Sequence, residues 1–535
     1  MLKKKIYYFI LSFTLVLSLF PGMSCLAQED CDIDTFAKKV EAIDGISDVT
    51  VVNDTTINAY IEQPLDWQSD TGKTFKQQFN IKYAANDVPT CYVVSGYTIQ
   101  YSNIESAVIR NSYTYNAVEI EYRYFGKSIP DGLDNDSVEL WEYLTVENAA
   151  NDIHALIEKL STLLTGKRMM TGSSKGGFTT NMQAYLYPDD CDLFMSFCAP
   201  LCENESDPRM YEFLNNTVGD DVLGKEEAKE CRDLILDFQV ECMRYKDDLK
   251  IQYKNIATGI SQEGEKNYRP VLMEDDGGKL FDVALIDFQA SVWMSQSGAQ
   301  DYSTIDGLKS TLKNVLDMPS STEEEVAAKE KEILRLLVMV CYPGGYACSK
   351  QNSSYPYLVQ SAMQMGNNAA DLSPLRERIE EEQKIDSSFP DLSITLEEEK
   401  TNMMSGYLTE EQIEMASKFD FVYDELMEWS KTTTANVVMI FGAVDPWYAT
   451  AIPENDNPNI QYVVVKSSDR YRAFGHSIGV PSYDEESQKV IYDAVDALFQ
   501  PDPVNTETPQ IVIYICYGMM VVLILSFFIK PKSSK

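Results

Sequence analysis

The chain has 535 residues, and its 83 acidic and 45 basic side chains give a formal net charge of −38 at pH 7. A surface of this sign repels nucleic-acid phosphates, so the composition excludes a protein that works by binding DNA or RNA. Hydrophobic residues make up 44% of a chain that is longer than one ordinary domain, so we expect a globular protein with more than one structural unit.

The N-terminal segment is typical of a secretory leader. Lysines at positions 3–5 precede an apolar run over residues 6–20, and small residues follow up to Ala27. A basic start, an apolar middle and a small-residue cleavage site are the three parts of a signal peptide. We therefore predict a signal peptide over residues 1–27 and an extracytoplasmic protein.

A strand, a loop and a helix are predicted next. Residues 116–121 are expected to form a strand, and the aromatic residues 122–128 are expected to form the loop that follows it. Apolar residues then recur at helical spacing over residues 153–164. His154 flanks this apolar stripe, so we interpret it as a histidine at the helix surface and not as a catalytic base.

The most informative motif is Gly-Ser-Ser-Lys-Gly at residues 172–176. It fits the Gly-x-Ser-x-Gly nucleophile elbow, and it lies between an extended segment and a helix-like segment, as this motif requires. The sharp turn strains the serine backbone, and small flanking residues keep strand and helix from colliding. Ser174 is therefore the predicted nucleophile. The expected oxyanion donors are the backbone N–H of Lys175 and that of Tyr124 or Phe125 in the earlier loop.

A long helical insertion is predicted after the elbow. Residues 203–432 are rich in Glu, Lys, Leu and Met, and both 226–250 and 322–340 have apolar residues at helical spacing opposite charged faces. We interpret 203–432 as a cap that closes over the site and restricts access to small or extended substrates.

Candidate substrate-binding residues lie in this cap and before it. Asp287, Phe288, Trp293 and Met294 could line a substrate pocket, although aromatic residues at this spacing are also typical of a helical core. Glu147 is a second candidate, because a site that binds a peptide amine requires a carboxylate.

Two apolar strands near the end of the chain lead to the predicted acid and base. Residues 435–442 read as a buried parallel strand, and Asp445 follows at its carboxyl end, where such sheets carry their chemistry. A β-rich run over 459–466 precedes His476. The order Ser, Asp, His is that of α/β-hydrolases. In this interpretation Asp445 orients His476, which takes the proton of Ser174.

The alternatives to this triad are few. The chain has only 2 histidines, and only His476 follows the predicted acid. A second Gly-x-Ser-x-Gly match at 475–479 contains Ser477, but a charged loop precedes it and Pro481 lies where an elbow helix would run. Ser477 is therefore not the predicted nucleophile. Asp469 is the alternative acid.

The C-terminal segment predicts a membrane anchor. Residues 511–529 carry no charged side chain and are about long enough to span a bilayer, and the basic tail over 530–535 is expected in the cytoplasm. The Pro- and Thr-containing residues 501–510 would form a stalk. We therefore expect an extracytoplasmic protein anchored to the cell membrane by a C-terminal transmembrane helix.

No cofactor and no metal site is predicted. The cysteine spacings are not those of a zinc finger, and both histidines already have another interpretation, so neither is left as a zinc ligand. No Gly-rich phosphate loop is present in the sequence. Nine of the 11 cysteines lie outside the leader and the apolar C-terminal segment, and their number suits an oxidising compartment but is odd. At least one thiol is then free or pairs elsewhere, while Cys341 and Cys348 could close a small loop.

Several of these segments resemble one group of peptidases. Residues 121–128, Glu-Tyr-Arg-Tyr-Phe-Gly-Lys-Ser, resemble the Glu-His-Arg-aromatic-aromatic-Gly segment of proline-directed serine exopeptidases, with Tyr122 where that group usually has histidine. Residues 141–152 are similar to the start of the helix that follows there. Residues 171–177, with Tyr-Pro-Asp-Asp at 187–190 behind them, resemble the elbow of secreted bacterial prolyl tripeptidyl aminopeptidases.

The resemblance covers roughly residues 50–500, and Asp445 and His476 match the last two catalytic positions of that family. The family is related to Pro-X carboxypeptidases and dipeptidyl peptidases. It implies an α/β-hydrolase core with an inserted helical cap, and removal of short peptides from a free N-terminus, often after proline.

The predicted fold class is α/β: an α/β-hydrolase core with a large inserted helical cap and a single C-terminal transmembrane helix. The predicted units are a signal peptide (1–27), a first core part (28–202), a cap (203–432), a second core part (433–500), a stalk (501–510), a transmembrane helix (511–529) and a cytoplasmic tail (530–535).

We expect a serine exopeptidase that acts on oligopeptides with free N-termini. It would release short peptides, tripeptides foremost, with proline or a small residue before the scissile bond. One alternative is another hydrolase on the same core: a dipeptidyl peptidase, a Pro-X carboxypeptidase or an esterase. The other is a catalytically silent surface binding protein, against which the complete set of Ser174, Asp445 and His476 argues.

Overall fold

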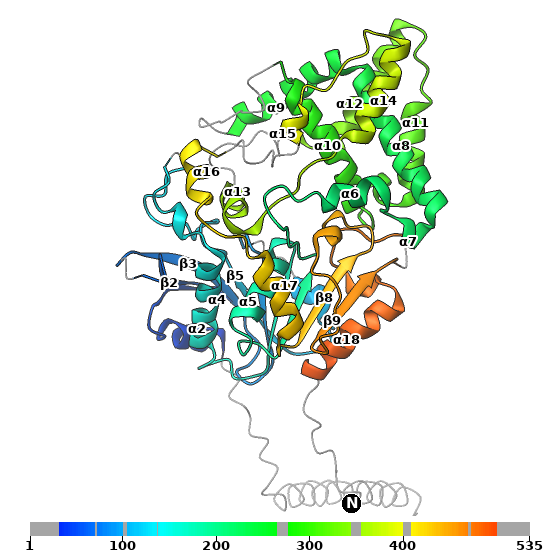
Figure 1. The fold of residues 1–535 in the computed structure, drawn as a ribbon. Helices are drawn as coiled ribbons and strands as arrows, with labels where there is room; N and C mark the ends of the chain where they lie inside the picture. The colour runs from blue at the N-terminus through cyan, green and yellow to red at the C-terminus, as the bar shows by residue number, and fades with distance from the viewer. Residues whose placement is uncertain are drawn as a thin grey trace, which may run out of the picture.

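One large sheet lies beneath a cap of helices (Figure 1). In the computed structural model the sheet has nine strands in the order β1-β2-β3-β5-β4-β6-β7-β8-β9. The structure describes residues 32–69, 72–99, 104–135, 137–264, 276–343, 355–399, 408–468 and 472–499.

The sheet is antiparallel at one end and parallel over the rest. β1, β2, β3 and β5 pair antiparallel in succession, and every pair from β5–β4 to β8–β9 is parallel. All residues of β4, β5, β7 and β8 are buried, as expected for strands that are covered on both faces. The strands are β1 (Ile46–Asn53), β2 (Thr56–Pro64), β3 (Thr74–Lys82), β4 (Thr90–Val94), β5 (Asn116–Ile120), β6 (Arg168–Ser173), β7 (Leu193–Phe197), β8 (Val437–Gly442) and β9 (Ile460–Val465).

Helices cover both faces of this sheet. One apolar cluster joins α2, α4, α5 and α17 to one face, and a second joins α3 and α18 to the other. The helices of this core are α2 (Ile33–Glu41), α3 (Ile104–Val108), α4 (Val146–Leu160), α5 (Lys175–Leu186), α17 (Tyr423–Thr432) and α18 (Glu485–Phe499). Short 3-10 helices add Trp141–Tyr143, Pro446–Thr450 and Val480–Ser482.

The cap is inserted between β7 and β8, and its helices lie above the sheet (Figure 1). α10 lies at its centre with most of its residues buried. The cap helices are α6 (Arg209–Asn216), α7 (Asp220–Leu223), α8 (Lys225–Arg244), α9 (Lys246–Gly264), α10 (Gly278–Met294), α11 (Ile305–Leu316), α12 (Glu323–Val340), α13 (Tyr355–Gln360), α14 (Ser373–Ile385), α15 (Leu396–Glu399) and α16 (Glu410–Ala416), with a 3-10 helix at Asp301–Ser303 and a π-helical turn at Ser361–Met365.

One part of the predicted fold class is wrong. Within the described ranges, no helix is both long and apolar enough to cross a membrane. The helices of 18 or more residues, α8, α9 and α12, are rich in charged side chains, and the apolar α10 has only 17 residues and contains Asp282 and Asp287. Over the described residues, the fold class is therefore corrected to an α/β-hydrolase core with a helical cap and no membrane-spanning helix.

Other expectations concern segments that the structure does not describe. The predicted signal peptide (1–27), stalk (501–510), membrane segment (511–529) and tail (530–535) all lie outside the described residues, as does Cys348 of the suggested Cys341–Cys348 pair. The boundaries predicted for the core and the cap stay predictions.

Candidate active site

Ser174 occupies a sharp turn between a strand and a helix. β6 ends at Ser173 and α5 begins at Lys175, and Ser174 between them has φ 57° and ψ −122°. A serine rarely adopts positive φ, at a cost of roughly 1–3 kcal/mol. A side chain on Gly172 or Gly176 would collide with the backbone carbonyl of Val94 in the neighbouring strand. The sequence therefore builds the strained strand–turn–helix that a nucleophile elbow requires.

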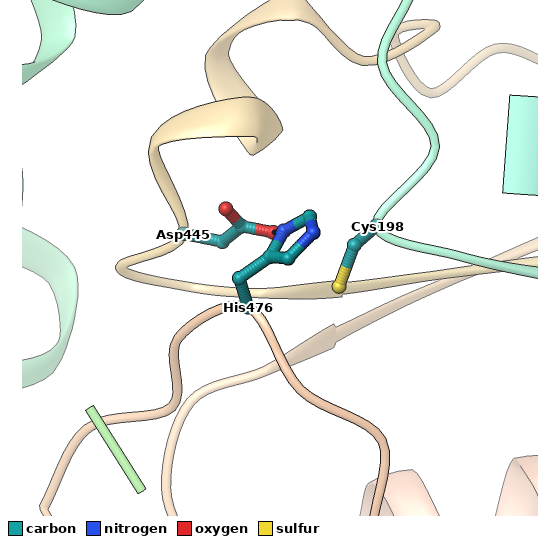
Figure 2. A group of neighbouring side chains, drawn as sticks. All are labelled: Cys198, Asp445 and His476. Atoms are coloured by element: carbon teal, nitrogen blue, oxygen red, sulfur yellow. Dashed lines mark hydrogen bonds and ion pairs between the residues drawn. The ribbon is translucent and has the colours of Figure 1, made fainter. Parts of the chain in front are cut away.

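Asp445 and His476 meet at the carboxyl edge of the same sheet (Figure 2). Asp445 caps the 3-10 helix after β8: its Oδ1 accepts a hydrogen bond from the backbone of Trp447 at 3.0 Å. Its Oδ2 lies 2.8 Å from Nδ1 of His476. The backbone N–H of His476 donates to the carbonyl of Met294, the last residue of cap helix α10, at 2.9 Å. Both members of the pair are thus fixed by backbone as well as by each other.

The environment favours the charged form of His476. Burial lowers the pKa of His476, but the charge of Asp445 and the hydrogen bond to it outweigh burial, so this pKa lies above its ordinary value. An imidazole whose protonated form is stabilised by a buried carboxylate is a stronger proton acceptor. The pair is therefore suited to act as a general base.

The second histidine is engaged elsewhere. His154, on α4, lies 2.7 Å from Asp190 through Nδ1 and stacks on Tyr187 with ring centroids 3.9 Å apart. Asp190 precedes β7 and so belongs to the amino-terminal edge of the sheet, opposite the edge that carries Ser174. The interpretation of His154 as a helix-surface residue agrees with this position.

The second Gly-x-Ser-x-Gly match lacks the geometry of an elbow. Ser477 lies in a loop, and a 3-10 helix at Val480–Ser482 follows it where an elbow would continue into an α-helix. Its Oγ is 3.2 Å from Oγ of Ser297 in the cap. The alternative acid, Asp469, lies outside the described residues.

Lys175 connects the elbow to the loop that follows β4. The lysine is buried, its Nζ donates to the carbonyl of Gly96 at 2.8 Å, and the same Nζ lies 3.2 Å from the centroid of the Tyr122 ring. Burial holds the pKa of Lys175 well below its ordinary value. A Cβ on Gly96 would lie only 2.9 Å from the backbone nitrogen of Gly176, so the Gly96 loop and the elbow are in direct contact.

The other two predicted oxyanion donors are already engaged. The N–H of Tyr124 donates to the carbonyl of Ser128 at 2.8 Å, and that of Phe125 donates to the carbonyl of Tyr122 at 3.1 Å. Their loop follows β5, whereas β4 lies between β5 and the elbow strand β6. The loop at Gly96, which follows the neighbouring strand β4, contacts the elbow directly, and the run Thr90–Val94 followed by Ser95-Gly96 could have indicated it. The assignment of Tyr124 or Phe125 as a donor stays a prediction.

The two tentative substrate residues have different surroundings. Trp293 is fully buried in the core of the cap, as an aromatic residue of a helical core would be. Glu147 lies in the first turn of α4 and is half-buried, and its carboxylate accepts hydrogen bonds from Nε2 of Gln364 at 2.9 and 3.1 Å.

Two cavities meet at the end of α10. One, of about 280 Å³, is lined by Asp287, Met294, Tyr357 and Trp447 among others. The second, of about 310 Å³, is lined by Met294 and His476 together with the start of the following cap loop. Met294 contributes to both cavities, and of the two the second is lined by His476, so it offers space for a small or extended ligand beside the imidazole.

Comparison with known proteins identifies the family. The model of the family described as PS-10 peptidase S37 matches residues 38–473. The chain is 24% identical over 385 residues to a prolyl tri/tetrapeptidyl aminopeptidase from Streptomyces mobaraensis, a match that covers 72% of this chain and 68% of that protein.

Solved α/β-hydrolases are also similar, at much lower identity. A peroxisomal alpha-beta-hydrolase from Saccharomyces cerevisiae is 9% identical with a TM-score of 0.34, over 88% of this chain and 97% of that chain. A thermophilic esterase from Thermogutta terrifontis is 13% identical with a TM-score of 0.31, over 82% of this chain and 99% of that chain. The family match confirms the resemblance seen in the sequence: the chain belongs to the PS-10 peptidase S37 family and is a serine peptidase with an α/β-hydrolase fold.

Proposed function

We propose that the protein is a serine exopeptidase that releases short peptides, tripeptides foremost, from the free N-termini of oligopeptides. Ser174, His476 and Asp445 form its triad in this proposal. The observation that carries it is the hydrogen-bonded Asp445–His476 pair at the same sheet edge as the strained Ser174, which follows β6. The similarity to a prolyl tri/tetrapeptidyl aminopeptidase supports the substrate class.

The proposed reaction assigns one role to each group. Oγ of Ser174 attacks the peptide carbonyl while His476 takes its proton and later returns it to the leaving amine. Asp445 keeps the imidazole in the required tautomer through its 2.8 Å contact with Nδ1. The N–H of Lys175, at the start of α5, is one oxyanion donor, and the loop of Gly96 supplies the second.

The cap supports the choice of short substrates. Its helices leave a cavity of about 310 Å³ that His476 lines and another of about 280 Å³ that shares Met294 with it, and spaces of this size suit a few residues of extended peptide and not a folded protein. In this proposal a carboxylate binds the free amine of the substrate. Asp287 is the candidate, because it lines the cavity that also contains Trp447, two residues after Asp445. Proline or a small residue before the scissile bond fits a pocket of this size.

The test is a panel of peptides with free and acetylated N-termini, together with a fluorophosphonate probe. We expect cleavage a few residues from a free N-terminus, loss of most of the rate on acetylation, and labelling of Ser174. Ser477→Ala should behave as wild type, whereas Ser174→Ala should lose labelling and at least about a 10⁴-fold factor in turnover. Equal cleavage of acetylated peptides would refute the aminopeptidase, and turnover of simple esters alone would make the protein an esterase.

A further inference from the structure

Cys198 joins the Asp445–His476 pair in a compact group of metal-binding side chains (Figure 2). Its sulfur, a carboxylate oxygen of Asp445 and an imidazole nitrogen of His476 all lie within 4.8 Å of one another. Among the residues that the structure describes, this is the one group of three His, Cys, Asp or Glu side chains that meets this criterion. The three residues come from three loops that are far apart in the sequence, so no short spacing motif could have predicted the group.

The position of the thiol is fixed by the sheet. Cys198 follows directly on β7, the strand between β6 and β8, and its backbone N–H donates to the carbonyl of Ile440 in β8 at 2.7 Å. Its φ of 50° turns the chain sharply at this point. The side chain lies beside the imidazole (Figure 2). The triad chemistry described above needs no group at this position.

We propose that Cys198, His476 and Asp445 form a reversible zinc site that inhibits the peptidase. Cysteine sulfur, imidazole nitrogen and carboxylate oxygen are the three ligand types that zinc takes in proteins, and three protein ligands leave a fourth position open to water. With Zn–S near 2.3 Å and Zn–N near 2.0 Å, ligand atoms on one tetrahedral ion are roughly 3.5 Å apart, so closure of the site requires shifts of about 1 Å. The thiolate favours zinc over magnesium or calcium.

The ion has a route to the site. His476 retains 14% side-chain exposure, whereas Asp445 and Cys198 are 0% and 1% exposed. His476 also lines the cavity of about 310 Å³ beside the cap. The imidazole is therefore the first ligand an entering ion meets, and the thiol, which gives up its proton to solvent on binding, lies behind it.

Inhibition follows from the ring nitrogen that binds the metal. Asp445 faces Nδ1, so an ion bound by both residues takes the place of the proton between them. The neutral imidazole then carries its one proton on Nε2 and cannot accept the proton of Ser174, so His476 is lost as a base. This inhibitory effect rests on the proposed function, but metal binding itself does not.

Cobalt is the probe for the site, because a thiolate bound to Co²⁺ produces a charge-transfer absorption in the near ultraviolet. Full-length protein purified without a histidine tag is titrated with Co²⁺. We expect one ion per chain with this absorption, displaced by one equivalent of Zn²⁺ and removed by a chelator. Cys198→Ser should lose the absorption and bind zinc more than about 100-fold more weakly, since even outer partners of a metal ligand contribute 10–100-fold.

The chain offers matched controls. Cys191 is also a buried thiol and precedes β7, whereas Cys198 follows it. Cys191→Ser should keep the absorption, and so should His154→Gln, which removes the other histidine. Absorption that persists in Cys198→Ser, or that disappears in Cys191→Ser, would overturn the site.

Wild-type protein provides a test that does not depend on how a variant folds. X-ray absorption of the zinc-loaded protein should show a sulfur ligand at about 2.3 Å. A first shell of nitrogen and oxygen alone would refute the proposal.

Activity measurements separate this proposal from the proposed function. Zinc at ten times its dissociation constant should lower wild-type peptide cleavage about tenfold, and a chelator should restore it. Cys198→Ser should keep its basal turnover and resist that zinc concentration. Equal inhibition of Cys198→Ser refutes the zinc site. Sulfur-ligated metal in a protein that cleaves no peptide leaves the zinc site standing and refutes the proposed function.

Discussion

Lys175 contributes to the site with its backbone and with its side chain. Its N–H opens α5 directly after Ser174, and its buried Nζ donates to the carbonyl of Gly96 at 2.8 Å. The same Nζ lies over the ring of Tyr122, 3.2 Å from the ring centroid. These contacts hold in place a side chain whose charged form burial disfavours. The side chain is thereby a positioning device for the loop that the proposed reaction uses.

We expect Lys175→Met to lower kcat about 10- to 100-fold with little change in KM. The variant keeps the backbone N–H but releases the Gly96 loop, and one oxyanion donor is typically worth 10²–10³ in kcat. Steady-state kinetics on a free-amine peptide measure this split. Lys127→Met, which changes an exposed lysine, is the control. A wild-type kcat in Lys175→Met would remove the positioning role.

Ser174→Gly should abolish turnover and increase the stability of the fold. Glycine adopts φ 57° without the penalty that serine pays, so the free energy of unfolding should rise by about 1–2 kcal/mol while turnover is lost. Urea unfolding measures the gain. Ser174→Ala should lose turnover without that gain, because alanine is as strained as serine. Equal stability of the two variants would mean that the elbow stores no such strain.

The loop after β5 holds the local structure together. Glu121 accepts hydrogen bonds from the backbone of Lys127 and from Oγ of Ser128, both at 2.8 Å, and so closes the loop on itself. Arg123 is fully buried and forms a two-pronged pair with Asp152 of α4 at 2.7 and 2.8 Å. The Glu-x-Arg part of this segment therefore ties the loop to α4.

Arg123→Met should cost about 3–5 kcal/mol of unfolding free energy, because it leaves the carboxylate of Asp152 buried without its partner. Thermal or denaturant unfolding measures the loss. Lys489→Met breaks a pair with Asp493 whose side chains are 75% and 63% exposed, so it should change stability by no more than about 0.5 kcal/mol. A comparable effect of the two substitutions would contradict the distinction between buried and exposed pairs.

The elements around the site could be predicted because their signals are local. The strands expected at 116–121, 435–442 and 459–466 correspond to β5, β8 and β9, and α5 follows the elbow as predicted. The order of strands could not be predicted in the same way, since β4 comes between β5 and β6 only through long-range pairing. That missing order explains why the sequence indicated the loop after β5 and not the Gly96 loop after β4, which contacts the elbow. The burial of Trp293 and the approach of Cys198 to His476 likewise depend on tertiary packing.

At the scale of the whole molecule, the proposed substrate site lies between the sheet and the cap. The sheet edge carries Ser174 and the Asp445–His476 pair, while α10 of the cap carries Asp287 into the cavity. We expect Asp287→Asn to raise KM about 10- to 100-fold for free-amine peptides, because hydrogen bonds to charged groups contribute about 1.5–3 kcal/mol. The residual rate on acetylated peptides should not change. If Glu147→Gln produces this effect and Asp287→Asn does not, Glu147 is the amine anchor.

The bond between His476 and the end of α10 couples the two layers mechanically. His476 donates its backbone N–H to Met294, Gly475 donates to Gln296 at 3.2 Å, and a side chain on Gly475 would collide with the α10 backbone. If the cap moved away at this end, the loop that carries His476 would either move with it or lose these two backbone hydrogen bonds. In the proposed reaction, admission of the substrate and alignment of His476 are therefore coupled through these backbone contacts.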